Sequence, residues 1–177
     1  MRPRSGVLRF ATVLPFLAAA ACGPAPSSDL PVSVAGAVAA LAQQCSEVGG
    51  TPDTSGAIKR ADLNGDTRED FVLYAGWINC ENAASIYGDR EKGLGVFATD
   101  ASGEVVEAFG DLVYDATIES AGSGSGSELW LTTSAESCGK PRAEVFAEES
   151  FCDRRIDWNP AAARFDWAPV STVRMIE

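Results

Sequence analysis

The sequence has 177 residues, with 25 acidic and 14 basic side chains and a formal net charge of −11. This excess of acid argues against a surface for nucleic acid or anionic lipid, because both would be repelled. The chain contains no histidine, which excludes the Ser-His and Cys-His nucleophile pairs of many hydrolases. The composition is compatible with one acidic globular domain, and it indicates no reaction.

The first 21 residues are predicted to be an export signal. Arg2, Arg4 and Arg9 give the segment a basic start, and residues 10–21 are apolar apart from Thr12. At about 12 residues the apolar run is too short to span a bilayer as a helix, which takes roughly 20 residues. Removing residues 1–21 leaves 11 basic against 25 acidic side chains, a formal charge of −14.

The end of this segment is followed by a cysteine in small-residue surroundings, Leu17-Ala-Ala-Ala-Ala-Cys22-Gly23. It resembles the lipobox of bacterial lipoproteins, which implies that Cys22 is lipidated and becomes the first residue of the mature chain. Ala19 stands where that family prefers leucine, so cleavage after Ala21 to a soluble periplasmic protein is the alternative. In the lipoprotein interpretation Gly23 implies sorting to the outer membrane, and residues 22–32 form a flexible tether.

Four cysteines remain in the mature chain, an even number in an exported protein, which predicts two disulfides with three possible connectivities. We expect pairing between neighbours in the sequence. A zinc site is the alternative, but the chain has no CxxC spacing and no histidine. The expected pairs are Cys45 with Cys80 and Cys138 with Cys152.

Residues 33–177 are predicted to form one α+β domain. Val34, Val38, Leu41 and Cys45 recur at helical spacing in residues 33–47, after a possible Ser33 cap and before a Gly-Gly stop. Short connections between the later strands predict antiparallel pairing. The expected fold is one N-terminal helix packed on a mainly antiparallel β-sheet. The expected strands are residues 57–61, 71–76, 94–99, 104–109, 114–120, 128–133, 143–147, 155–158 and 163–167.

One acidic loop, residues 62–70, gives the clearest indication of a binding site in the sequence. Oxygen-bearing residues alternate along residues 62–70, and calcium binds six to eight such oxygens. Gly65 allows a sharp turn within the loop. The loop is not an EF-hand, because its twelfth position is Leu73 and not a bidentate glutamate. The predicted calcium ligands are Asp62, Asn64, Asp66, the backbone carbonyl of Arg68, and Asp70.

The loop resembles the Asp-x-Asn-Gly-Asp-x-x-x-Asp calcium loops of FG-GAP and VCBS repeats over residues 58–75, which implies the same ligand positions. Thr67 stands at the sixth position, where those loops usually have glycine. A propeller needs repeated blades, and the chain has no second acidic loop. The alternative is an acidic turn whose side chains cap their own backbone without metal. Calcium, if bound, is expected to stabilise the fold.

A second resemblance covers most of the mature chain. The chain is similar to small exported proteobacterial proteins of unknown function that combine a cysteine helix ending in Gly-Gly, one such loop and a C-terminal cysteine pair near a tryptophan. The matching features are Cys45, Gly49-Gly50, the loop, Cys80, and Cys138 with Cys152 beside Trp158. This resemblance implies no activity.

The leading hypothesis is a lipid-anchored, calcium-stabilised structural or binding protein of the cell envelope without evident catalysis. It would meet the membrane only through its lipid, and Trp77 is a candidate contact for a partner. The first alternative is an acidic inhibitor or binder of a cationic partner, such as a cell-wall lytic enzyme. The second is a small carboxylate-dependent hydrolase, with Asp157 or Asp166 beside tryptophan as the candidate acids.

Overall fold

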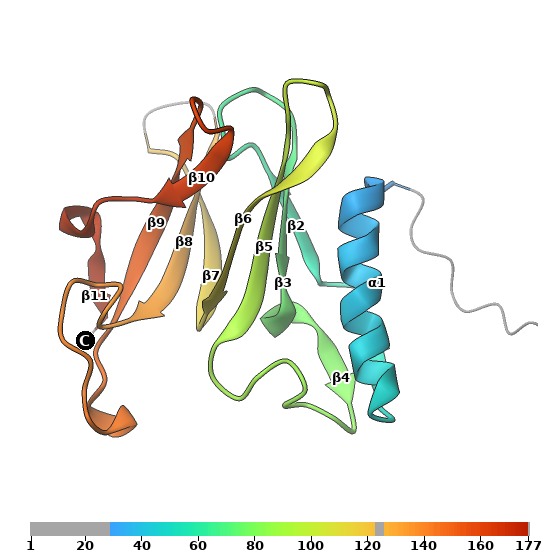
Figure 1. Cartoon of the computed structure of the whole chain (residues 1–177), viewed down its shortest axis with the longest axis horizontal. Helices are drawn as coiled ribbons and strands as arrows, with labels where there is room; N and C mark the ends of the chain where they lie inside the picture. Colours follow the sequence, from blue (N-terminus) through green and yellow to red (C-terminus); the bar gives the residue numbers. More distant parts are fainter. Residues whose placement is uncertain (1–28, 123–125, 177) are drawn as a thin grey trace, which may run out of the picture.

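The computed structural model describes residues 29–122 and 126–176. The predicted signal segment and Cys22 lie outside the described residues. The chain forms three layers, a helix, a central sheet and a C-terminal sheet (Figure 1). None of the helices in the described ranges is long and apolar enough to cross a membrane.

Helix α1 is the outer layer on one side, and the central sheet has four antiparallel strands in the order β2-β3-β5-β6. The elements are α1 (Val32–Glu47), β2 (Ile58–Ala61), β3 (Asp70–Tyr74), β5 (Lys92–Thr99) and β6 (Val105–Val113).

The C-terminal sheet is the third layer. Its strands follow the order β10-β9-β8-β7, and β11 pairs with the first part of β9. Every pairing in it is antiparallel. The strands are β7 (Asp115–Ser120), β8 (Ser127–Ser134), β9 (Phe151–Asn159), β10 (Arg164–Trp167) and β11 (Arg174–Ile176).

Short elements complete the chain. Strands β1 and β4 form a two-stranded sheet of their own. The 3-10 turns η1 and η3 follow β3 and β10, and η2 precedes β9. Their bounds are β1 (Thr51–Asp53), β4 (Asn79–Glu81), η1 (Ala75–Trp77), η2 (Phe146–Glu148) and η3 (Val170–Thr172).

The two middle strands of the central sheet, β3 and β5, are buried on both faces. Along β3 every residue is buried. Successive side chains of a strand point to opposite faces of the sheet, so both faces are covered at this strand. Val72 and Tyr74 join the inter-sheet core against the C-terminal sheet. Phe71 and Leu73 join the helix-side core. A strand covered on both sides has an unbroken apolar sequence, as Phe71-Val-Leu-Tyr74 does.

The predicted helix is confirmed, but the predicted serine cap is wrong. The helix begins after Pro31, with no side-chain cap. The Ser33 hydroxyl instead donates a hydrogen bond to the carbonyl of Val105 in β6. Tyr87 donates a hydrogen bond to the carbonyl of Leu41 at 2.8 Å. These bonds and the apolar stripe fix α1 on the central sheet.

Both expected disulfides are present in the structure. Cys45 in α1 pairs with Cys80 in β4, with Cα atoms 5.8 Å apart. Cys138 pairs with Cys152 in β9, with Cα atoms 6.0 Å apart. The first bridge connects the helix to the segment that follows the central strand β3, and the second closes the loop between β8 and β9.

The Gly49-Gly50 pair after the helix has a geometric explanation. Gly49 ends the helix with φ +82°, a conformation that favours glycine. Gly50 lies against the first disulfide, and a Cβ there would come within 2.4 Å of the Cys80 sulfur and 2.8 Å of the Cys45 sulfur. The second glycine is therefore required by close packing.

The predicted strand 143–147 is wrong. Within it, residues 146–147 belong to the 3-10 turn η2 and the rest is irregular. The Glu149 carboxylate organises this loop by accepting hydrogen bonds from the backbone N–H groups of Ala135 and Ala143. The backbone N–H of Ala143 is therefore bonded to a side chain and not to a neighbouring strand.

Strand β6 is longer than the predicted 104–109. Phe97 pairs with Glu107 and the preceding Val96 pairs with Phe109, so Ala108 is the additional residue of a β-bulge. A bulge breaks the two-residue alternation that identifies a strand in a sequence. The other expected strands are present with shifted ends, and the short strands β1, β4 and β11 were not predicted.

Candidate functional site

The acidic loop connects two neighbouring strands of the central sheet. β2 ends at Ala61 and β3 begins at Asp70, and these two residues face each other in the ladder. Leu63 packs against the inter-sheet core. The carbonyl of Asp62 accepts a hydrogen bond from the N–H of Ser127 at the start of β8, at 2.7 Å. The loop therefore lies where the central and C-terminal sheets meet.

Three of the predicted ligand side chains bind the backbone of the loop itself. Asp62 accepts hydrogen bonds from the N–H groups of Gly65 and Thr67 at 2.7 and 3.0 Å. The Asn64 side chain accepts one from Asp66 at 3.0 Å. Asp66 Oδ1 accepts one from the N–H of Arg68 at 2.8 Å. Such bonds stabilise an acidic turn with or without a metal.

Asp70 differs from the other acids because it is completely buried, with 0% of its surface exposed. Its Oδ2 accepts hydrogen bonds from the N–H groups of Leu63 and Asn64 at 2.9 and 3.2 Å. Its Oδ1 has no hydrogen-bond partner among the residues that the structure describes. Burial, reinforced by the negative charges of Asp66 and Asp62, raises the pKa of Asp70 to about 6.

The backbone of the loop contains two residues in the left-handed region. Gly65 has φ 78° and Thr67 has φ 66°. The first fits glycine, but a β-branched residue adopts this conformation only under strain. Thr67 thus has a backbone conformation that suits glycine better than threonine.

Arg68 pairs with one of the predicted ligands. Its Nε and Nη2 donate hydrogen bonds to Asp66 Oδ2 at 2.9 and 2.6 Å, and this pairing holds the pKa of the Asp66 carboxyl below its ordinary value. As the side chains lie, no group of three or more His, Cys, Asp or Glu residues in the described part of the chain could hold a metal ion. A cation would have to displace Arg68 from Asp66.

Trp77, the candidate partner contact, is half-buried at the end of η1. Its ring packs edge-to-face on Tyr74, with centroids 5.4 Å apart. The Lys59 ammonium lies 3.8 Å from the centroid of the ring. The part of Trp77 that remains accessible is therefore bordered by a cation of the chain itself.

The two acids considered for a hydrolase are paired. Asp157 accepts a hydrogen bond from Arg155 at 2.7 Å. Asp166 accepts hydrogen bonds from Asn159 and Arg164, both at 2.8 Å, and these lower its pKa. Asp166 therefore lacks the raised pKa that a general acid needs.

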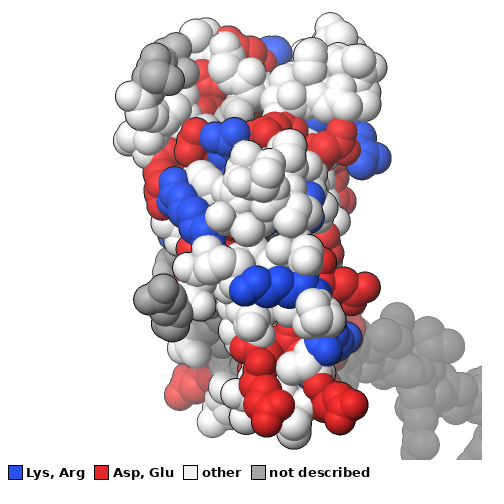
Figure 2. Space-filling model, turned by 90° about the vertical axis from the view of Figure 1, so that its left-hand side faces the viewer, with Lys and Arg blue, Asp and Glu red and all other residues white. Residues whose placement is uncertain are grey.

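The outer face of the C-terminal sheet carries charges of both signs. Arg174 pairs with Glu119 at 2.9 Å and lies 3.4 Å from the ring centroid of Trp130. Arg155 pairs with Glu128 as well as with Asp157. Figure 2 shows basic and acidic side chains next to one another on this side of the molecule. Carboxylates on this face are already paired with arginine side chains, so fewer of them are available to a cationic partner.

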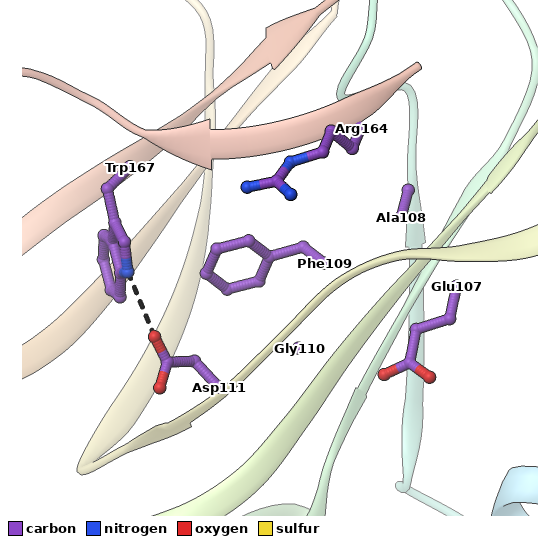
Figure 3. A pocket seen from close by; sticks show the side chains of 7 residues that line it. All are labelled: Glu107, Ala108, Phe109, Gly110, Asp111, Arg164 and Trp167. Atoms are coloured by element: carbon purple, nitrogen blue, oxygen red, sulfur yellow. Dashed lines mark hydrogen bonds between the residues drawn. The ribbon is translucent and has the colours of Figure 1, made fainter. Parts of the chain in front are cut away.

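The structure contains a pocket at the edge of the molecule that was not predicted from the sequence. It has a volume of about 450 Å³ and lies between β6 and β10 (Figure 3). Its β6 residues include Asp111, which lies beyond the predicted end of that strand. Trp167 follows one of the candidate acids, Asp166, in the sequence, but nothing local places it beside Asp111. The residues that give the pocket its chemistry are Glu107, Phe109, Gly110, Asp111, Arg164 and Trp167.

Comparison of the chain with models of known protein families, with curated proteins and with solved structures finds no match. The fold and the loop define a disulfide-bonded protein with a helix and two antiparallel sheets in three layers.

Proposed function

We propose that the chain is an exported, calcium-stabilised binding or structural protein of the cell envelope, with the acidic loop as the ion site. The ligands would be Asp62, Asn64, Asp66, the carbonyl of Arg68, and Asp70. The observation that carries the proposal is the fully buried carboxylate of Asp70, whose Oδ1 has no partner within residues 29–122 and 126–176.

A buried carboxylate is costly unless it is paired or bound to a cation. With a pKa of about 6, Asp70 stays mainly ionised at neutral pH. Two backbone N–H groups satisfy one oxygen, and no donor in the described part of the chain reaches the other. A hard divalent cation supplies the missing interaction, and carboxylate, amide and carbonyl oxygens are the donors that calcium prefers.

The position of the loop supports a structural use of the ion. The loop joins β2 to β3, and through the Asp62 carbonyl it also contacts β8. Calcium bound there would hold the central and C-terminal sheets together at one end. It would also neutralise part of the excess negative charge of the chain.

The cellular location of the protein is part of the proposal. The basic and apolar start of the chain and the small residues before Cys22 support export and lipidation at that cysteine. The two disulfides support an oxidising compartment, because such bonds are rare in the reducing cytosol. The domain would then be tethered to the outer membrane through residues 22–32.

Calcium titration of the chain without residues 1–21, with Cys22→Ser, tests the ion site. Calorimetry and thermal melting are expected to show saturable binding and a raised melting temperature, and Asp66→Ala should abolish both. Asp100→Ala is the matched control, because Asp100 also caps its own turn, at Ser102 and Glu104. It should leave the calcium response unchanged. No heat and no change in melting temperature at millimolar calcium would refute the proposal.

A further inference from the structure

The pocket between β6 and β10 lies at an open seam of the molecule. β6 is the last strand of the central sheet and β10 is the last strand of the C-terminal sheet. The two end strands come close to each other without hydrogen-bonding as a ladder. A volume of about 450 Å³ between them is within the range of pockets that hold small ligands.

Two aromatic rings form the apolar part of the pocket. Phe109 and Trp167 meet edge-to-face, with ring centroids 5.5 Å apart and an interplanar angle of 83°. Both rings are half-buried and pack against the inter-sheet core. This packing restricts their rotamers, so the exposed parts of the rings form a surface that is already in place before a ligand binds.

Asp111 is oriented by hydrogen bonds to both of its oxygens. The Trp167 indole Nε1–H donates to Asp111 Oδ2 at 3.0 Å (Figure 3). The backbone N–H of Leu112 donates to Oδ1 at 2.8 Å. A carboxylate oxygen accepts more than one hydrogen bond. Asp111 thus presents fixed acceptors beside the aromatic rings.

The rest of the lining has charges of both signs. Figure 3 shows the Arg164 guanidinium extending into the pocket beside Phe109. It pairs with Asp166 through a hydrogen bond from Nε and an ion pair with Nη2. A Glu107 carboxylate oxygen lies 2.8 Å from the place where a Cβ of residue 110 would be. Glycine at that position leaves room for the Glu107 carboxylate beside β6.

We propose that this pocket binds a short segment of a neutral saccharide. An anionic ligand would be repelled by the carboxylates of Glu107 and Asp111, and a small hydrated cation would leave the apolar surface of Phe109 and Trp167 unused. A sugar hydroxyl both donates and accepts hydrogen bonds. It can therefore donate to the carboxylates and accept from the guanidinium, while the apolar C–H groups of the ring pack on Phe109 and Trp167.

The experiment is an NMR titration of the mature chain with tetrasaccharides of β-linked N-acetylglucosamine, β-linked glucose and α-linked glucose. The four tryptophans give four indole N–H signals. The signal of Trp167 and the amide signals of Gly110 and Asp111 should shift saturably with at least one sugar. The signal of Trp130, on the outer face of the C-terminal sheet, should not.

Asp111→Asn should weaken the binding about tenfold, because hydrogen bonds to a charged acceptor are lost. Asp115→Asn is the matched control. Like Asp111, Asp115 accepts a hydrogen bond from the N–H of the next residue, Ala116, at 2.8 Å. It lies outside the pocket lining, so the control should bind as the unchanged chain does.

Three results would overturn the saccharide site. They are no shift with any of the sugars at millimolar concentration, equal binding by the Asp111→Asn variant, and shifts at these residues with spermidine in place of sugar. The pocket contains no residue of the acidic loop. Repeating the titration with calcium and with chelator therefore separates a failure of the saccharide site from a failure of the ion site.

Discussion

At the scale of single residues, Asp70 decides how the loop behaves. The other loop acids are partly exposed and hydrogen-bonded, whereas Asp70 is buried and one of its oxygens has no partner among the described residues. A group of this kind destabilises the fold when nothing neutralises it and stabilises the fold when a cation is bound. The same side chain should therefore have opposite effects under two conditions.

Asp70→Asn is expected to raise the melting temperature in chelator and to remove the stabilisation by calcium. The neutral amide eliminates a buried charge whose pKa is raised to about 6. We expect a gain on the order of 1 to 2 kcal/mol in chelator at pH 7. Thermal melts of both proteins in chelator and in calcium check this. A variant that melts lower in chelator and still responds to calcium would contradict the role of Asp70.

Thr67→Gly is expected to stabilise the loop. Thr67 has φ 66°, which costs a β-branched residue about 1 to 2 kcal/mol, and the greater freedom of glycine in the unfolded chain offsets part of the gain. We expect about 0.5 to 1 kcal/mol in urea unfolding, together with tighter calcium binding. Thr54→Gly is a control, because Thr54 has no positive φ and its replacement should not stabilise.

At the scale of elements, the Gly49-Gly50 segment ties the helix to the disulfide. We expect Gly50→Ala to destabilise the protein by about 1 to 3 kcal/mol, because its Cβ would overlap the sulfur atoms of Cys45 and Cys80. Gly36→Ala in the exposed part of α1 meets no atom within 4 Å and should stabilise by about 0.5 to 1 kcal/mol. Urea unfolding of both variants measures the difference, and a harmless Gly50→Ala would show that the contact is not tight.

The elements also show what a sequence can reveal. The helix, both disulfide pairs and most strands followed from local periodicity, cysteine spacing and turn residues. Residues 143–147 have apolar residues at strand spacing, yet the Glu149 carboxylate binds the backbone of that loop. The bulge at Ala108 breaks the alternation of β6, so the second half of this strand was not predicted. Local sequence patterns do not predict the structure where a side chain from outside the segment, or an additional residue in a bulge, determines the backbone conformation.

The candidate site shows the same limit. The alternation of oxygen-bearing residues along 62–70 marked this loop as the candidate site. The burial of Asp70 and the contact between Asp62 and Ser127 depend on how two sheets pack. The pocket between β6 and β10 depends on two strands that are more than 50 residues apart in the chain, as the Asp111–Trp167 hydrogen bond shows. No local pattern contains that information.

At the scale of the whole molecule, Tyr74 connects the two sheets. It lies in β3, and its hydroxyl donates a hydrogen bond to the carbonyl of Tyr114, between β6 and β7, at 2.6 Å. Burial, with a smaller contribution from the charge of Asp115, raises the pKa of Tyr74 to about 12. The folded molecule therefore requires the neutral phenol.

The sign of the pH dependence follows. Below pH 10 Tyr74 is neutral in both states and adds no pH dependence. Between about pH 10 and 12 the unfolded chain loses this proton and the folded chain keeps it, so stability falls by about 1 kcal/mol per pH unit. Urea unfolding from pH 9 to 11 should show this slope, and Tyr74→Phe should reduce it. An unchanged slope in the variant would assign the loss to other groups.

The two disulfides also determine how the molecule responds to force. The described chain enters at the helix layer and ends at the C-terminal sheet (Figure 1), so tension between its ends pulls the outer layers apart. Cys45–Cys80 and Cys138–Cys152 remove residues 45–80 and 138–152 from the length that can be extended. The acidic loop lies within the first of these segments. A domain pulled at its ends would therefore lengthen mainly between Cys80 and Cys138, while the loop itself carries no load along the chain.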